Sequence, residues 1–250
     1  MSYIVLVGAS SAIAQAVAKQ ILQRNQKPNQ SVQQKLILIS SKPTTEFEHN
    51  DRVIAIDCDY SEQAICSAIE QVDKRVHGDW QQVTQVIIFN GVLHNPLISP
   101  EKRLEDVSAH ALSQLYQSNT IVPFLFVKQV ALYLSHQCRC QLIVFSARVG
   151  SINDNKLGGW YGYRSSKAAL NMLLQTAAIE LRRRAKQCMI VAFHPGTTDT
   201  PLSRPFQANV KPQQLFSPDF VAIACLNVTA NLVCDGHLHY VDWQGKPIEF

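Results

Sequence analysis

Short apolar runs alternate along the chain with longer segments in which apolar residues recur every three or four positions. The runs are nearly continuous in Val, Ile and Leu and cover residues 3–7, 36–39, 53–56, 86–89, 142–145 and 189–193. Strands that are covered on both faces lose the polar residues that alternate in a half-exposed strand. The runs therefore predict the central strands of a parallel sheet.

The segments between these runs have the spacing of amphipathic helices. It predicts helices from residue 61 onward and over residues 12–22, 161–185 and 218–232, and a last strand near residues 238–242. A longer helical segment, 104–134, contains Pro123, which marks a bend or a boundary between two helices.

Regular alternation of strand and helix, joined by right-handed crossovers, predicts an α/β fold. We expect a single Rossmann-type domain over residues 1–250, a doubly wound parallel sheet of about seven strands with helices on both faces. Residues 24–34 form a polar connection and not an interdomain linker. Ligands of such a sheet bind beyond the carboxyl ends of its strands.

Composition and charge narrow the possible partners. Of the 250 residues, 46% are hydrophobic and 17% are charged, and the net charge is +4. Such a small and scattered excess of basic residues favours a small-molecule partner over nucleic acid or an anionic membrane. No apolar stretch reaches the roughly 18 residues of a membrane helix, and the first residues lack the features of a signal peptide. We therefore expect a cytoplasmic protein.

The seven cysteines and eight histidines are scattered without the spacing of metal ligands. The cysteines include no C-x-x-C pair, which is typical of reduced intracellular thiols. His237 and His239 would share one face of a strand, but no cysteine or acid completes a set of ligands. We expect no bound metal.

A turn of small residues joins the first predicted strand to the first predicted helix. A helix amino terminus offers unpaired N–H groups and partial positive charge to a phosphate, and small residues allow the phosphate to approach. Ala12 and Ala14 stand where a glycine-rich turn would carry glycines, and an alternative interpretation is a turn without a ligand. The predicted pyrophosphate-binding residues are Gly8, Ser10, Ser11, Ala12 and Ile13.

The end of the second predicted strand indicates which dinucleotide would bind. In dinucleotide-binding folds an acid at this place binds the ribose 2′-hydroxyl of NAD. Here the strand ends in Ser40, Ser41 and Lys42, which include no acid and can donate hydrogen bonds or positive charge to a 2′-phosphate. We therefore expect NADP(H) in preference to NAD(H), although a lysine after a strand is also a common solvent-exposed residue.

Tyr163 and Lys167 lie four positions apart near a predicted helix start. This spacing places them on one face of the helix, about 40° apart at roughly 100° per residue. A nearby ammonium favours the phenolate and so lowers the pKa of the phenol towards working pH. The pair would therefore act as a proton relay, while the alternative is a solvent-facing helix pair.

The chain resembles the short-chain dehydrogenase/reductase family, within it the C-factor-like and sniffer-like carbonyl-reductase branch. The resemblance covers essentially the whole chain and lies in motifs that occur in the family's order, at residues 8–10, 58–61, 90–94, 119, 148–152, 158–172 and 194–196. It implies an NAD(P)-dependent oxidoreductase that acts on a carbonyl or alcohol. It also implies a homodimer or homotetramer and a substrate lid near residues 197–217.

The resemblance also assigns roles to single residues. Tyr163 would transfer a proton to or from the substrate oxygen, Lys167 would bind the nicotinamide ribose, and Asn119 would hold a relay water. Asp59, with Tyr60 beside it, would meet the adenine. Further residues would line the cofactor, the last four of them beside the nicotinamide amide: Asn90, Gly91, Pro195, Gly196, Thr198 and Thr200.

One departure from the family pattern affects the chemistry. Ala147 stands where relatives carry the serine whose hydroxyl steadies the substrate carbonyl, and a methyl group cannot replace that bond. Ser146 should face the other side of the strand, and Ser151 is the alternative substitute. The departure leaves open a second function, a dinucleotide-binding regulatory protein with weak or no catalysis. Candidate substrate contacts are His94, Trp160 and Phe206.

Overall fold

The computed structural model describes residues 1–24 and 33–250, so most of the polar connection expected over residues 24–34 lies outside the described residues. Seven parallel strands form one sheet in the order β3-β2-β1-β4-β5-β6-β9. Their bounds are β1 Ser2–Val7, β2 Gln34–Ser40, β3 Val53–Asp57, β4 Val83–Ile88, β5 Gln141–Phe145, β6 Met189–His194 and β9 His239–Asp242. The seven-stranded doubly wound sheet predicted from the sequence is therefore confirmed.

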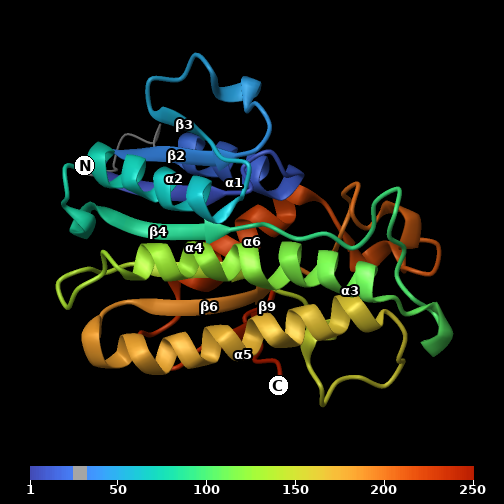
Figure 1. Cartoon of the computed structure of the whole chain (residues 1–250). Helices are drawn as coiled ribbons and strands as arrows, with labels where there is room; N and C mark the ends of the chain where they lie inside the picture. Colours follow the sequence, from blue (N-terminus) through green and yellow to red (C-terminus); the bar gives the residue numbers. More distant parts are fainter. Residues whose placement is uncertain (25–32) are drawn as a thin grey trace.

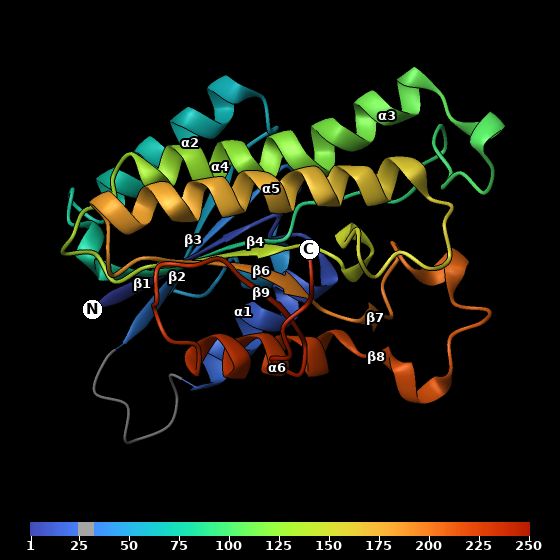
Figure 2. The same cartoon turned by 90° about the horizontal axis from the view of Figure 1, so that it is seen from below.

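Helices cover both faces of the sheet (Figures 1 and 2). Figure 2 shows α2, α4 and α5 on one side of the strands and α1 and α6 on the other. The sheet and these two layers enclose two apolar cores, in which strand residues alternate: Val5 and Val7 face one core, and Ile4 and Leu6 face the other. The helix bounds are α1 Ala12–Arg24, α2 Glu62–Arg75, α3 Ala109–Tyr116, α4 Val122–Ala131, α5 Tyr161–Arg184 and α6 Pro218–Ala230.

The helical segment expected over residues 104–134 is divided. It begins with a short 3-10 turn, Leu104–Asp106, continues as α3, widens into a π turn at Gln117–Ile121, and ends as α4. Pro123 lies in the first turn of α4, where its missing N–H costs no hydrogen bond. The boundary expected at this proline is therefore confirmed. The expectation of a helix from residue 104 is wrong, because Val107 and Ser108 have extended backbones and Ser108 caps α3.

The strand order reverses between β1 and β4, so the connections after these two strands leave in opposite directions. Such a switch point opens a crevice at the carboxyl ends of the strands. A two-stranded parallel ribbon, β7 Thr197–Thr198 and β8 Leu215–Phe216, lies beyond the same edge and encloses the segment expected to form a lid. In the described part of the chain, no helix is both long enough and apolar enough to cross a membrane.

Candidate active site

A cavity of about 300 Å³ opens at the carboxyl ends of the central strands. Residues from α1, from the connections after β4, β5 and β6, and from α5 line it together. Of the predicted site residues the lining includes Ile13, Asn90, Gly91, Ser146, Trp160, Tyr163, Lys167, Pro195, Gly196, Thr198, Thr200 and Phe206. The fold thus brings residues that are up to 193 positions apart in the chain to one place.

Tyr163 and Lys167 both face this cavity from the first turns of α5. Lys167 is only 2% exposed, and its Nζ donates a hydrogen bond of 2.9 Å to the carbonyl oxygen of Phe145, at the end of β5. Burial lowers the pKa of Lys167 to about 8, because the charged ammonium is desolvated. The end of β5, which lies about 20 residues earlier in the chain, thus fixes the position of the Lys167 ammonium.

The pKa of Tyr163 differs from the sequence-based expectation. The ammonium was expected to lower it, but burial raises the pKa of Tyr163 to about 12. Desolvation dominates, because the phenol sits in a largely apolar cavity wall and the lysine ammonium is bonded to the Phe145 carbonyl. Tyr163 is therefore a neutral phenol over the whole physiological pH range, which is the form that donates a proton.

Gly91 allows Lys167 and Asn119 to approach the connection after β4 closely. A Cβ atom at Gly91 would lie 3.3 Å from Lys167 Nζ and 3.4 Å from Asn119 Oδ1. The distance to Lys167 Nζ is tighter than an ordinary contact, so a side chain here would require the ammonium to shift by a few tenths of an ångström. Gly91 therefore sets the spacing among the three residues.

Asn119 lies in the π turn between α3 and α4 and is fully buried. Its Oδ1 accepts a hydrogen bond from Val92 N at 2.6 Å, and its Nδ2 donates to Val92 O at 2.9 Å and to Ser166 Oγ at 3.1 Å. The side chain thereby joins the connection after β4 to α5, next to Lys167. The relay water expected at Asn119 stays a prediction; a π turn is a common feature of functional sites because it rearranges the main-chain hydrogen bonds.

The predicted pyrophosphate turn has the geometry of an anion site. Gly8 has a φ of +77°, and a Cβ atom there would lie 3.1 Å from Asn90 Oδ1. Ser11 Oγ accepts from Ala14 N at 3.3 Å and so caps α1, and Ile13 in the first turn of this helix lines the cavity. Ala12 therefore fits the helix start without a positive φ, which is the condition under which alanine replaces glycine there.

Three buried polar atoms in the cavity wall have no hydrogen-bond partner among the described residues: Asn90 Oδ1, His194 Nδ1 and Thr198 Oγ1. Buried polar groups are normally paired, so each is a place where a polar ligand would supply the missing bond. Asn90 and Thr198 lie where the sequence predicts cofactor contacts, and His194 is the last residue of β6. Gly196, with a φ of +73°, lets the chain turn between β6 and Thr198. The residues present thus fit a nicotinamide dinucleotide.

The predicted adenine-side residues lie at the same edge of the sheet but outside the 300 Å³ cavity. Ser40, buried at the end of β2, accepts a hydrogen bond from Lys42 N at 3.2 Å, while Ser41 and Lys42 are exposed. On the neighbouring strand connection Asp59 Oδ1 accepts from Ser61 N at 2.8 Å, which lowers the pKa of this exposed carboxyl. These groups would surround the outer end of a long ligand that enters from the cavity.

The two serines considered as substitutes at Ala147 have other partners. Ala147 lines the cavity with an extended backbone (φ −153°, ψ 143°). Ser146 donates its hydroxyl to Asn171 Oδ1 at 2.6 Å, on the α5 side of the strand. Ser151 Oγ accepts from Asp154 N at 3.1 Å and is not among the described residues that line the cavity. Both hydroxyls thus already have a hydrogen-bond partner in the structure, and a substitute serine stays a prediction.

Aromatic rings form the outer wall of the cavity. Trp160 packs edge-on against Phe206 at 5.3 Å between centroids and against Tyr163 at 6.3 Å. His94 does not line the cavity; it packs on Phe206 at 5.4 Å, and its Nε2 lies 3.2 Å from Pro201 O. His94 thus contacts two residues of the expected lid, Pro201 and Phe206.

Sequence reasoning missed the aliphatic part of the lining, Leu93, Val149, Leu202 and Val210. Single apolar residues in connections have no helix or strand periodicity. The only signal that could have found them is their position just after the strand ends. It also missed Glu101, which lies in a connection without helix or strand spacing and is buried beside α5.

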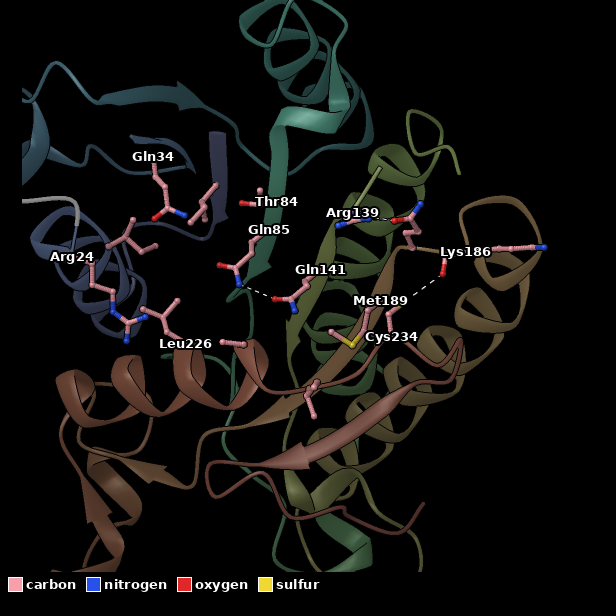
Figure 3. Close-up of a pocket in the computed structure, with 15 residues that line it drawn as sticks. Arg24, Gln34, Thr84, Gln85, Arg139, Gln141, Lys186, Met189, Leu226 and Cys234 are labelled. Carbon is pink, nitrogen blue, oxygen red and sulfur yellow. Dashed lines mark hydrogen bonds between the residues drawn. The ribbon is translucent and has the colours of Figure 1, made fainter. Parts of the chain in front are cut away.

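A second cavity, of about 580 Å³, lies at the opposite edge of the sheet (Figure 3). Gln85 and Gln141 meet in it with a hydrogen bond of 2.8 Å. Of its three basic residues, Arg24 and Lys186 stand at or just beyond the ends of α1 and α5, where cations compensate the negative end of the helix dipole. The third, Arg139, donates a hydrogen bond of 2.6 Å to Gln187 Oε1. Structural roles account for these groups, so we place the candidate active site at the carboxyl edge. Among the residues that the structure describes, no three His, Cys, Asp or Glu side chains gather to hold a metal ion.

Comparison with known proteins agrees with this geometry. A benzil reductase ((S)-benzoin forming) of Bacillus subtilis is 23% identical over 257 residues, which cover 96% of this chain and 98% of the relative. The C-signal protein of Myxococcus xanthus is 28% identical over 145 residues, 58% of this chain and 82% of that protein.

Among solved structures, the carbonyl reductase Sniffer of D. melanogaster has a TM-score of 0.82 with 19% identity and covers 100% of both chains. An NADPH-bound carbonyl reductase from chicken fatty liver has a TM-score of 0.82 with 20% identity and covers 100% of this chain and 94% of that one. The family model described as short chain dehydrogenase matches residues 2–211. The chain belongs to the short-chain dehydrogenase family.

Proposed function

We propose that the protein is an NADP(H)-dependent carbonyl reductase in which Tyr163 transfers the proton. The observation that carries the proposal is the meeting of Tyr163 and Lys167 in one cavity, with the lysine fixed by the Phe145 carbonyl and by the narrow space at Gly91. A bound nicotinamide would supply or accept the hydride at its C4 atom. The protein's own residues would position the substrate carbonyl and transfer the proton.

The roles of the residues follow from their environments. Tyr163, a phenol whose pKa is raised to about 12, would donate its proton to the oxygen of the reduced carbonyl. Lys167 would donate hydrogen bonds from its buried ammonium to the ribose hydroxyls and resupply the proton. Trp160 and Phe206 would exclude water and cover an apolar substrate. Supporting evidence is that the similar Bacillus protein is named for the reduction of benzil, an aromatic diketone.

The direct test is a binding titration with NADPH and NADH. It is followed by activity assays that measure oxidation of the preferred cofactor with a panel of carbonyl substrates. Benzil and simple aromatic and aliphatic ketones form the panel. We expect tighter binding of NADPH and consumption of NADPH that depends on the added carbonyl. Tight binding without turnover on any carbonyl would favour the second function below, and absence of binding of either cofactor would contradict both.

The preference for NADP(H) rests on Ser40, Ser41 and Lys42. We expect Lys42→Ala to raise the dissociation constant for NADPH about 10-fold and to leave that for NADH within about twofold, because only NADPH carries the 2′-phosphate that the ammonium would pair with. Fluorescence titration measures both constants. Lys74→Ala, which removes a lysine near the end of α2, is the control for a general loss of positive charge. Equal weakening of both cofactors would contradict the assignment.

The pH dependence of kcat/KM for NADPH should report Lys167, because this ratio reflects groups of the free enzyme. Burial lowers the pKa of Lys167 to about 8, so the ammonium is present below this pH and is lost above it. We expect kcat/KM to be level below about pH 7 and to fall as the pH rises through about 8, while Tyr163 stays protonated throughout. A ratio that stays level up to pH 9.5 would contradict this role of Lys167.

A second function is favoured by Ala147, which leaves the cavity without the family's serine hydroxyl. The protein would then bind the dinucleotide as a regulatory or signalling protein and catalyse weakly or not at all. The partial similarity to the C-signal protein supports this alternative. Substitution of Ala147, described in the Discussion, discriminates between the two.

We also propose that the protein forms a homodimer or homotetramer through the outer faces of α4 and α5. Met172 and Ile179 on α5 are exposed there, as are Ile121 and Leu132 at the two ends of α4. Exposed apolar groups gathered on neighbouring helices are typical of interfaces. Sedimentation equilibrium tests the proposal, and a monomer at micromolar concentration would contradict it.

A further inference from the structure

The connection between β4 and α3 brings one acidic side chain, Glu101, under the amino terminus of α5. Glu101 is only 3% exposed. Its carboxylate Oε2 accepts a hydrogen bond from Gly162 N at 3.2 Å, and its main-chain oxygen accepts another from Trp160 N. These two bonds are made to residues on either side of the helix start, directly before Tyr163.

The helix that carries Tyr163 depends on this contact, because it lacks a cap of its own. The residue before its first turn, Trp160, has a left-handed backbone (φ 53°, ψ 43°), and no side-chain cap bond is made from it within the described structure. By contrast, α2, α3 and α6 are capped by the serines that directly precede them, Ser61, Ser108 and Ser217. The first N–H groups of a helix need an acceptor, and here a residue about 60 positions upstream provides it.

The carboxylate fits between α3 and α5 with little free space. A Cβ atom at Gly162 would lie 2.9 Å from Glu101 Oε1 and 2.6 Å from Leu115 Cδ1, so only glycine permits this approach. Figure 1 shows α3 beside the amino-terminal end of α5. The position of the carboxylate therefore determines the position of the helix start.

The cap bond to Gly162 N uses only one of the two carboxylate oxygens of Glu101. Glu101 Oε1 is buried without a hydrogen-bond partner among the described residues, which costs free energy. Leu112 and Leu115 of α3 approach Gly162 on the same side as this oxygen, so the surroundings are apolar. The free-energy cost of burying this unpaired oxygen is more easily explained if Glu101 positions residues of the candidate active site.

We propose that Glu101 is a positioning residue of the candidate active site, one that holds the aromatic wall at Trp160 and the proton donor at Tyr163 in register. The inference rests on the proposed function, since it assigns Glu101 a role in the same reaction. Loss of the carboxylate removes the bond to Gly162 N and leaves only the main-chain bond to Trp160 N, so the helix start that carries the wall and the phenol is held at one point instead of two. Displacements of about 1 Å at a reacting centre can cost up to roughly 10²-fold in rate.

The test compares three variants of Glu101 with a matched loss of a helix cap elsewhere. Glu101→Ala removes the acceptor, Glu101→Asp keeps the charge but shortens the reach, and Glu101→Gln keeps an acceptor oxygen. Ser108→Ala removes the exposed cap of α3 and controls for the loss of a cap bond alone. For each variant we would measure kcat, KM for the carbonyl, the dissociation constant for NADPH, and hydrogen exchange of the amides of residues 160–163.

We expect kcat to fall about 10- to 100-fold in Glu101→Ala and Glu101→Asp and to stay within about threefold in Glu101→Gln and Ser108→Ala. The dissociation constant for NADPH should change less than about threefold in all of them, since the cofactor contacts lie on other segments. Exchange at residues 160–163 should accelerate at least 10-fold in Glu101→Ala and be restored in Glu101→Gln.

Unchanged kcat in Glu101→Ala and Glu101→Asp, with an active parent protein, would overturn the positioning role even if the melting temperature falls. If Glu101→Ala does not fold, the comparison of Glu101→Asp with Glu101→Gln decides. If the parent protein binds NADPH but reduces no carbonyl, the proposed function fails separately, and unchanged exchange at residues 160–163 would then overturn the anchoring by Glu101.

Discussion

Tyr163→Phe is expected to lower the carbonyl-dependent oxidation of NADPH by roughly 10³-fold, within the range that a single acid–base group contributes. The substitution removes only the hydroxyl, so the ring still packs against Trp160. The proton must then come from water, which the aromatic wall excludes. The dissociation constant for NADPH should stay within about twofold, because Lys167 and the turn at Gly8 are unchanged. Steady-state kinetics and fluorescence titration measure the two quantities.

Tyr161→Phe is the matched control. Tyr161 is exposed, precedes Tyr163 by two positions on the same helix, and is not among the described residues that line the cavity. It should keep kcat within about twofold of the parent protein. Turnover by Tyr163→Phe within tenfold of the parent would show that another group donates the proton, and the proposed mechanism would be wrong.

Ala147→Ser is expected to raise kcat for carbonyl reduction by about 10- to 100-fold. Ala147 lines the cavity, and the hydroxyls of Ser146 and Ser151 are already bonded to Asn171 Oδ1 and Asp154 N. A hydroxyl at residue 147 would add a hydrogen-bond donor to the carbonyl oxygen as negative charge develops on it. Removing one such donor typically costs about 10²–10³ in rate, and adding one without optimised surroundings should recover part of that effect.

Ala147→Cys is the control for size, because a thiol is similar in volume to the hydroxyl side chain but is a weak hydrogen-bond donor. It should change kcat by less than about threefold. If the parent protein shows no turnover and Ala147→Ser creates it, the natural protein is a dinucleotide-binding protein and the second function holds. If Ala147→Ser leaves an active parent unchanged, a group other than a serine already steadies the carbonyl.

The sequence predicted the architecture because the relevant signals are local. Continuous apolar runs indicated the central strands, and the three- to four-residue spacing indicated the helices between them. The boundary at Pro123 was also predictable, since proline restricts its own helix. The polar start of β4 was not predictable, because it depends on pairing with a distant strand: Gln85 pairs with Ile4 of β1, and Thr84 lies at a register shift in this pairing.

The candidate site also has some features that the local sequence predicts and others that depend on tertiary contacts. The four-residue spacing of Tyr163 and Lys167 was enough to place both on one helix face, and the structure directs both into one cavity. The sequence did not reveal the direction of the Tyr163 pKa, the use of the Ser146 hydroxyl by Asn171, or the cap that Glu101 provides to α5. Each of these depends on burial or on a partner from a distant segment.

The sequence by itself thus determined the order of the elements and the residue types available at the carboxyl edge of the sheet, because periodicity and helix geometry involve only neighbouring residues. The tertiary structure decided which of these groups are desolvated, which hydroxyls are already bonded, and which distant acid bonds the amino terminus of α5. The reason is physical: desolvation and hydrogen bonding depend on the surroundings in space, and the surroundings of Tyr163 come from five separate segments of the chain.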